Sequence, residues 1–456
     1  MNKSYRESEF EKTILEPLQH TSKQFWLVAG LLGLISLWGA VALGQQWWLG
    51  LGVTGLNRPV YWGIYLSNFI FFSGLSMSGT LISAILRVTQ AEWRRPVTRL
   101  AETITFFALI LCVLQVWIDM GRPDRVFYPF IWGRYQSPFL WDFTAISVYL
   151  LSSGVYLYLP MLPDLARLRD HMTGAPPWRH RLYTILALGW HGSHEQHRRL
   201  EKAISVLAIV IIPIGVSVHT VVSWIFGMTM KPMWHSTILG PYFIVGAIFS
   251  GIAVLFIFMT LLRKAWHLEK WFGDKQYNYL GLLLLVFSGL WLYFTLAENL
   301  TTGYSSMTEE VQVLWARLTG EYGGWFWLMV CTNLIIPLTI LLRRKGRTPT
   351  GTFIVSVGVV FGMWVERYLI VAPSLTRSTL GFEPAVYIPS LTEIAITLGS
   401  LALFALCVLL FFKLFPAISV WEVEEGEAIE SVQRQARLLA EQEKLPATGT
   451  TVRSVN

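Results

Sequence analysis

Ten long apolar stretches separated by short polar gaps are the feature that most constrains this chain of 456 residues. A helix needs about 20 apolar residues to cross the hydrocarbon core of a bilayer. The spans are predicted at 25–48, 60–86, 103–119, 140–162, 203–228, 238–262, 279–298, 324–342, 352–371 and 391–413. Because 54% of the residues are hydrophobic and only 14% are charged, the sequence predicts an all-α polytopic membrane protein with ten transmembrane helices.

The basic residues fall mainly into alternate gaps between the spans. The other gaps and the spans hold only a few: Arg58, Arg122, Arg125, Arg134, Lys231, Arg317, Arg367 and Arg377. Cytoplasmic loops of membrane proteins retain Lys and Arg in this way. We therefore expect both termini to be cytoplasmic in a bacterial cytoplasmic membrane. The net charge of +7 is then explained by anionic lipid as the partner, and no nucleic-acid partner is expected.

The predicted organisation has two units and a weak internal repeat. Tyr65 and the pair Ser73-Gly74 in the second span match Tyr242 and Ser250-Gly251 in the sixth span at one common offset, which favours a parallel repeat of two four-helix units. The predicted parts are a cytoplasmic arm (1–23), a first four-helix unit (24–162), a cytoplasmic loop (163–202), a second four-helix unit (203–342), two extra helices (352–413) and a cytoplasmic tail (414–456), whose stretch 422–444 is expected to be a solvated helix.

Ionisable side chains inside the spans fall toward the side of the membrane opposite the basic loops. This set comprises Asp119, Asp142, His219, Glu298 and Glu366. Charged groups at membrane depth are costly, so they are candidates for function. Carboxylates at helix ends that simply meet water, a packed His219 and a buried Glu366–Arg367 ion pair are the structural alternatives for these residues. The small residues of the second span, Ser73 to Gly79, suit helix packing or a slot for a flat ring.

The sequence predicts that this chain binds no iron–sulfur cluster, haem or metal ion of its own. The three cysteines, Cys112, Cys331 and Cys407, form no CxxC pair, so no iron–sulfur cluster is predicted. Only His219 lies clearly inside a span, whereas a transmembrane haem needs two facing histidines. His191, His194 and His197 lack a closed ligand pattern, and we predict no metal site.

Several motifs resemble the NrfD/PsrC family of quinone-interacting membrane subunits, and within it the ActC subunits of alternative complex III. The motifs are Glu92-Trp93-Arg94-Arg95-Pro96, Asp119-Met120-Gly121-Arg122-Pro123, Ser137-Pro138-Phe139-Leu140-Trp141-Asp142, Ser217-Val218-His219-Thr220-Val221-Val222-Ser223, Trp234-His235-Ser236-Thr237-Ile238, Pro241-Tyr242-Phe243, Gly246-Ala247-Ile248-Phe249-Ser250-Gly251 and Met363-Trp364-Val365-Glu366-Arg367. ActC-like chains carry His where this chain has Asp119, whereas smaller NrfD-type relatives carry Asp. The sister protein ActF has a similar architecture.

The resemblance implies a membrane protein that oxidises menaquinol or ubiquinol and carries no haem or iron–sulfur cluster of its own. It implies an iron–sulfur subunit docked on the outer face, multihaem cytochrome c subunits and a sister NrfD-like membrane subunit as partners. The complex would be a respiratory or photosynthetic quinol:electron-acceptor oxidoreductase, with proton translocation as an added possibility, and the chain would not be active alone.

The residues are assigned roles on this basis. A carboxylate in a low-dielectric site suits a general base for quinol protons. Asp119, Asp142 and His219 are predicted as catalytic, and Tyr65 and Arg122 join the two aspartates as quinone-binding residues. Glu298, Glu366 and Arg367 are predicted as a proton route. The alternatives are a secondary transporter and the membrane anchor of another molybdopterin or iron–sulfur oxidoreductase.

Overall fold

The computed structural model describes residues 18–426 except 20, 58, 172–175 and 378–386, together with four residues of the tail: 428, 431, 432 and 435. Most of the predicted arm and most of the predicted tail therefore lie outside the described residues. Within the described part the chain is helical and contains no β-strand, as predicted.

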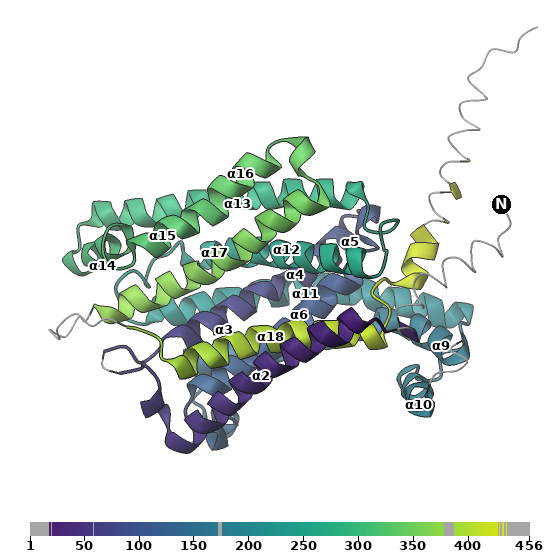
Figure 1. Cartoon of the computed structure of the whole chain (residues 1–456), viewed down its shortest axis with the longest axis horizontal. Helices are drawn as coiled ribbons and strands as arrows, with labels where there is room; N and C mark the ends of the chain where they lie inside the picture. The colour runs from purple at the N-terminus through teal and green to yellow at the C-terminus, as the bar shows by residue number, and fades with distance from the viewer. Residues whose placement is uncertain are drawn as a thin grey trace, which may run out of the picture.

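Ten helical segments of the described chain are long and apolar enough to cross a membrane, which confirms the predicted number. Their bounds are Lys23–Leu49 (α2), Ile64–Val88 (α3 to α5), Thr98–Asp119 (α6), Pro138–His171 (α8 and α9), His194–Met228 (α11), Leu239–Ala265 (α12), Asp274–Ser305 (α13), Gly323–Leu341 (α15 and α16), Pro349–Thr376 (α17) and Leu391–Leu414 (α18). The spans lie roughly along the long axis of the molecule (Figure 1). Shorter helices in the connections include α7 (Tyr128–Trp132), α10 (Pro177–Leu186) and α14 (Thr308–Leu318).

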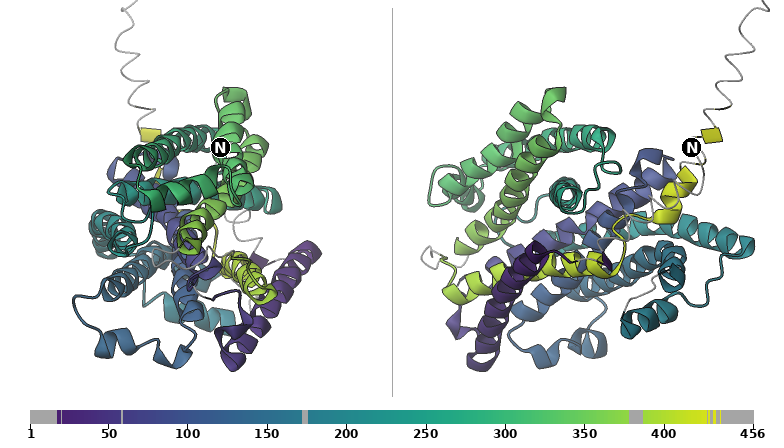
Figure 2. Two further views of the ribbon diagram at one scale, coloured as in Figure 1. Left: turned by 90° about the vertical axis from the view of Figure 1, so that its left-hand side faces the viewer. Right: turned by 45° about the vertical axis from the view of Figure 1, so that its right-hand side comes forward.

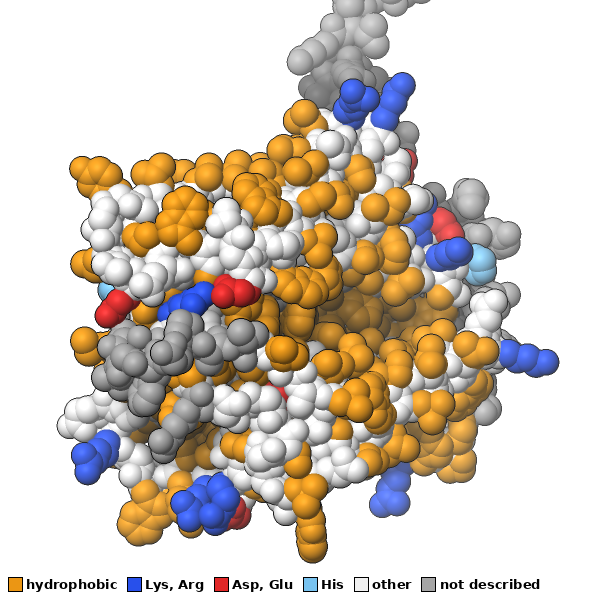
Figure 3. All heavy atoms as spheres, turned by 60° about the vertical axis from the view of Figure 1, so that its left-hand side comes forward, with side chains coloured by type: hydrophobic (Ala, Val, Ile, Leu, Met, Phe, Trp, Pro, Cys, Tyr) orange, Lys and Arg blue, Asp and Glu red, His pale blue; other side chains and the backbone are white. Residues whose placement is uncertain are grey.

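The surface between the two ends is mainly apolar. Figure 3 shows a face on which hydrophobic side chains prevail and charged side chains gather toward the edges. The first span illustrates this, because only 17% of its most apolar window is buried inside the protein. Such a surface suits hydrocarbon as the solvent, and the chain is an integral membrane protein.

The spans assemble around two central helices, α3 and α12. The α3 segment packs against α6 and α11, and α8 completes this first unit. Helix α12 packs against α13 and α17, and α15 and α16 complete the second unit. The extra helices are α2 and α18, which lie side by side at one edge of the bundle (Figure 2). The predicted units 24–162, 203–342 and 352–413 rest on the internal repeat and stay a prediction. The first and last spans pair through a Gly39–Gly399 contact, where an ideal Cβ on Gly39 would lie 2.7 Å from the Cα of Gly399.

The two helices that carry the predicted repeat cross each other in the middle of the molecule. An ideal Cβ on Gly251 of α12 would lie 2.9 Å from the backbone nitrogen of Ser78. An ideal Cβ on Gly74 would lie 3.3 Å from the Ser250 hydroxyl oxygen. The small residues of the second span therefore serve close helix packing, since a larger residue at position 251 would push the helices apart. The repeat itself stays a prediction.

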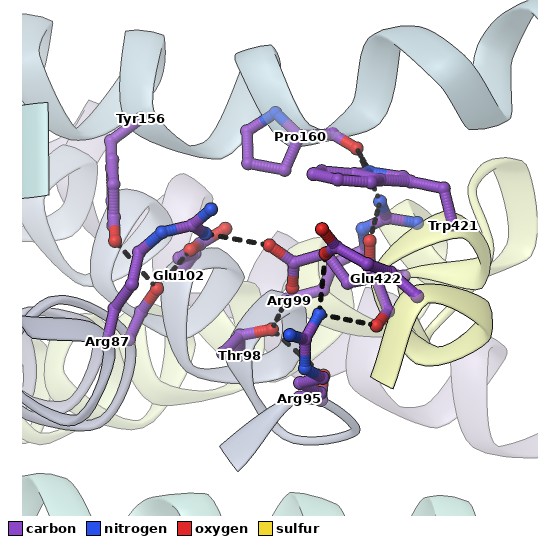
Figure 4. A network of polar contacts seen from close by, with 12 residues as sticks. Arg87, Arg95, Thr98, Arg99, Glu102, Tyr156, Pro160, Trp421 and Glu422 are labelled. Carbon is purple, nitrogen blue, oxygen red and sulfur yellow. Dashed lines mark hydrogen bonds and ion pairs between the residues drawn. The ribbon is translucent and has the colours of Figure 1, made fainter. Parts of the chain in front are cut away.

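Basic side chains mark one end of the bundle, which we call the basic end. Arg99 forms a buried ion pair with Asp164 of α9 (2.7 Å), and the carboxylate of Asp164 accepts hydrogen bonds from the backbone nitrogens of Val420 and Trp421. Glu422 pairs with Arg87 (2.8 Å) and accepts a hydrogen bond from Thr98 (Figure 4). These contacts hold the segment after α18 against α6 and α9.

The prediction that a solvated helix begins at residue 422 is wrong, because the first residues of that stretch are buried. Trp421, Glu422 and Val423 are buried, because the arginines of the basic end offer Glu422 partners that water would otherwise supply. Burial by itself raises the pKa of Glu422, but Arg87 and Arg94 outweigh burial and hold this pKa below its ordinary value. The ionised carboxylate therefore stabilises the folded state.

We predict that Glu422→Gln lowers the stability of the protein by about 3–5 kcal/mol at neutral pH, because it leaves buried arginines without a counter-charge. The lowered pKa means that the contribution is present at neutral pH and is lost as the pH falls below the ordinary glutamate value of 4.5. Thermal unfolding in detergent from pH 7 to pH 3 measures both effects. The control is Glu425→Gln, since the side chain of Glu425 is 40% exposed in its pair with Arg95 and should contribute about 0–1 kcal/mol. Equal losses in the two variants would contradict the prediction.

Candidate functional site

A cavity of about 190 Å³ lies inside the first unit, at the end of the bundle opposite the basic end. We call this the cavity end. The cavity is enclosed by α3, α6, α8, α11 and the loop after α11. Its apolar lining comprises Trp62, Leu66, Phe69, Val116, Met120, Phe139, Val222, Ile225, Phe226 and Trp234. The polar lining comprises Tyr65, Gln115, Asp119, Asp142 and Thr229. The structure thus brings together three of the predicted site residues, Tyr65, Asp119 and Asp142.

Three oxygen atoms around the cavity are buried without a hydrogen-bond partner. They are Oε1 of Gln115, Oδ1 of Asp119 and Oδ1 of Asp142. A buried acceptor that is left unpaired costs free energy, so such groups need a reason to persist. Three of them around one apolar cavity indicate a site that receives hydrogen-bond donors from a ligand.

A hydrogen bond to α18 holds the side chain of Gln115 and so sets the direction of its oxygen. Its side-chain nitrogen donates to the Ser400 hydroxyl of α18 at 2.9 Å, which fixes the amide and leaves its oxygen free. Gln115 lies one helical turn before Asp119 on α6, so both side chains occupy the same face. Sequence reasoning missed Gln115 because the search was limited to ionisable groups.

Aromatic rings form the open side of the cavity. Trp62 and Phe139 are 41% and 42% exposed, whereas Trp234 is buried. The rings of Trp62 and Trp234 stack with 6.4 Å between their centroids, and the Trp234 indole nitrogen donates to the carbonyl of Ile370 at 2.8 Å. Neither tryptophan was predicted as a site residue, because the two rings meet only in the folded protein.

The extra helices support the polar wall of the cavity. The Tyr65 hydroxyl donates to Oε1 of Gln46 in α2 at 2.5 Å, and Nε2 of Gln46 donates to the carbonyl of Ile118 at 3.0 Å. Ile118 immediately precedes Asp119. Tyr65 is therefore a cavity residue whose hydroxyl is already engaged, and it connects the start of α3 to the end of α6.

Hydrogen bonds to Tyr387, just before α18, and to Glu393, at its start, hold the loop that carries Trp62. The Tyr387 hydroxyl donates to Glu393 at 2.5 Å and accepts from the backbone nitrogen of Ile64 at 3.0 Å. Glu393 also accepts from the backbone nitrogen of Gly55 at 2.7 Å. Burial and the Glu393 carboxylate raise the pKa of Tyr387, so its hydroxyl stays protonated and keeps donating.

His219 and Arg122 do not line the cavity, and their predicted roles stay predictions. The two ring nitrogens of His219 face the carbonyls of Gly215 (2.9 Å) and Ser73 (3.1 Å), so backbone groups of α11 and α3 engage the ring. Arg122 is exposed and pairs with Asp124 at 3.1 Å. Its hydrogen bond and charge hold the pKa of Asp124 below the ordinary value. A position near the cavity in sequence is therefore not enough to place a side chain in it.

The predicted proton route lies in the second unit, apart from the cavity. Glu366 accepts a hydrogen bond from the Trp291 indole at 2.6 Å and lies 3.4 Å from the guanidinium of Arg367, and both side chains are buried. Glu298 accepts from the Ser236 hydroxyl at 2.7 Å. No contact in the described part of the chain joins Glu298 directly to Glu366, and the route stays a prediction.

The described residues contain no group of three or more His, Cys, Asp or Glu side chains that could hold a metal ion. The polar groups that line the cavity offer hydrogen bonds to a ligand and, through the two carboxylates, acceptors for its protons.

The chain is similar to known membrane proteins along most of its length. Residues 52–378 match the family model described as polysulphide reductase, NrfD. A putative dimethyl sulfoxide reductase membrane subunit of Halobacterium salinarum is 26% identical, over 86% of this chain and 91% of the relative. A selenate reductase subunit of Mesobacillus selenatarsenatis is also 26% identical, over 85% of this chain and 93% of the relative. An Hdr-like menaquinol oxidoreductase integral membrane subunit of Archaeoglobus fulgidus is 25% identical, over 82% of this chain and 89% of the relative.

We predict that Tyr65→Phe destabilises the protein by about 1–3 kcal/mol, because it leaves the buried Oε1 of Gln46 without its donor. Thermal unfolding of the purified protein in detergent measures the change. Tyr293→Phe is the control, since Tyr293 of α13 is 63% exposed and its hydroxyl need not be satisfied by the protein. An equally stable Tyr65→Phe variant would show that the Tyr65–Gln46 contact does not support the cavity wall.

Proposed function

Since the chain belongs to the NrfD family, we propose that it is the quinol-binding and quinol-oxidising membrane subunit of a multisubunit oxidoreductase. Its relatives carry the names of membrane subunits of redox complexes, and one is named for menaquinol. The proposal for this chain also rests on its own cavity.

The observation that carries the proposal is the set of unpaired oxygens of Gln115, Asp119 and Asp142 in an aromatic cavity. A quinol is a flat ring with two hydroxyl donors, which complements such a wall of acceptors. The volume of about 190 Å³ exceeds the roughly 150 Å³ of an apolar cavity known to admit benzene. The open side between Trp62 and Phe139 leaves room for a larger fused ring.

Oxidation of one quinol gives one quinone, two protons and two electrons. We assign the first proton to Asp142, whose buried carboxylate reaches the cavity from the second turn of α8. Asp119 accepts or relays the second proton at the last residue of α6. Gln115 orients a hydroxyl through its free oxygen and transfers no proton. The electrons pass to an iron–sulfur cluster in a partner subunit.

The orientation follows from the charges at the two ends. The basic end carries Arg87, Arg94, Arg95 and Arg99, and cytoplasmic ends of membrane proteins are rich in Lys and Arg. We propose that the basic end and both termini face the cytoplasm, so that the cavity end faces outward. An iron–sulfur subunit docked there receives the electrons, and multihaem cytochromes and a sister membrane subunit complete the assembly. This ActC-like arrangement rests on the motif resemblance, as does proton translocation through Glu298, Glu366 and Arg367.

A position near one membrane face also argues against a secondary transporter, whose substrate site lies near the bilayer midplane. Asp119 is the last residue of its helix and Asp142 lies four residues after the first residue of α8. This location suits a reaction partner on one face of the membrane.

We predict that Asp142→Asn in the intact complex lowers kcat for quinol oxidation by about 10²–10⁴-fold, because an amide of the same shape does not accept a proton. Steady-state quinol oxidation with the complex's own acceptor measures the loss. Asp124→Asn is the control, since Asp124 lies exposed in the neighbouring loop and does not line the cavity. Unchanged turnover and quinol affinity in Asp142→Asn would remove Asp142 from the reaction.

A further inference from the structure

The cavity continues into a narrow crevice between α6 and α8. The two spaces share Val116, Phe139 and Asp142 as lining residues. Beyond them the crevice is lined by Val113 of α6 and by Phe143, Ile146 and Ser147 of α8. The crevice therefore adjoins the cavity at Phe139 and Asp142 and extends along α8 to Ile146 and Ser147.

The crevice lies on the lipid-facing side of the first unit. Phe139, which lines the crevice, is 42% exposed, and Phe143 and Ser147 are half-buried. On α6, Ile110 lies one helical turn before Val113 and is 37% exposed. The Gln115 side of α6 is instead covered by α18 through the bond to Ser400. An apolar crevice on the uncovered side of α6 and α8 meets hydrocarbon rather than water when the spans are in a membrane.

The aromatic segment before α8 indicates the depth of this crevice. Tyr128 and Trp132 of α7 and Tyr135 just after it are exposed. Exposed aromatic side chains of this kind favour the interface between lipid and water. The crevice lies along residues 139–147, which places its far end about 14 Å below the start of α8 at 1.5 Å per residue. This is the level of the lipid acyl chains.

We propose that the α6–α8 crevice is the passage through which the isoprenoid chain of the quinol leaves the cavity and enters the bilayer. This inference rests on the proposed function. The head group occupies the cavity, and the chain passes Asp142 and runs between Val113 and Ser147. A long hydrocarbon chain is unfavourable in the water at the mouth beside Trp62, so a lateral exit into lipid is the favourable one.

Phe143 controls the width of this passage. Its ring meets that of Phe130 edge to face with 4.6 Å between centroids and lies 6.5 Å from that of Phe139. The free space of about 10 Å³ in the crevice is too small for an isoprenoid chain, so the Phe143 ring must rotate when the chain enters. Val113 and Ser147 form the walls that remain, and neither lines the cavity.

The test fills the crevice without touching the head-group site. Val113→Trp and Ser147→Phe, each in the intact complex, are assayed with a quinol bearing several isoprenoid units and with a tailless dimethylnaphthoquinol. We expect kcat/KM for the long-chain quinol to fall at least about tenfold while kcat/KM for the tailless quinol stays within about twofold. Leu151→Trp is the control, because it adds the same bulk to the lipid-facing side of α8 outside the crevice.

The outcomes separate the two proposals. Equal loss with both quinols, or no loss with either, would overturn the passage while leaving quinol oxidation in place. A wild-type complex that oxidises neither quinol would overturn the proposed function itself. If both crevice variants fail to fold, the wild-type complex is labelled with a quinone carrying a photoreactive diazirine on its chain. Labels on Val113, Phe143, Ile146 or Ser147 support the passage, and labels confined to other helices contradict it.

Discussion

The crossing of α3 and α12 is the contact on which the rest of the structure depends. Gly74 and Gly251 let the two backbones approach, and each helix then serves as the centre of one unit. Apolar surface gains little from burial against other helices when the alternative is lipid, so close packing of small residues must hold the spans together. Because α3 is fixed at this crossing, its start at Tyr65 meets the ends of α6, α8 and α11, and this meeting encloses the cavity.

The sequence was sufficient for the number and order of the spans but not for their ends or for the pairing of the first span with the last. The predicted third span began at 103 because Arg99 and Glu102 count against a membrane helix, yet α6 begins at Thr98. Arg99 pairs with Asp164, and Glu102 accepts a hydrogen bond from Ser83. These partners come from distant segments, so hydropathy alone had no means of including them. The pairing of the first span with the last also cannot be inferred from the order of the spans along the chain.

Only the charged residues of the candidate site could be predicted from the sequence. Asp119 and Asp142 were found because carboxylates at membrane depth are rare and costly. Gln115 was missed because an amide carries no charge, although its free oxygen is buried and unpaired as theirs are. His219 is the opposite case: its residue type suggested proton transfer, the backbone carbonyls of Gly215 and Ser73 face its ring, and its catalytic role stays a prediction. Residue type and depth identify candidates, whereas the hydrogen-bond partners of each atom decide between them.

The polar groups in the interiors of the two units have different surroundings. Tyr65 and Tyr242 occupy matching positions in the predicted repeat, and each hydroxyl forms a hydrogen bond inside the protein, to Gln46 and with Thr295 respectively. Beside Tyr65 lies an open cavity with unpaired acceptors. In the second unit, Oε1 of Glu366 accepts from Trp291, and Oε2, which accepts no hydrogen bond from the described residues, lies 3.4 Å from the guanidinium of Arg367, so both oxygens face protein groups. A carboxylate already surrounded by protein groups is poorly placed to receive a ligand hydroxyl, which is why we assign substrate binding to the first unit alone.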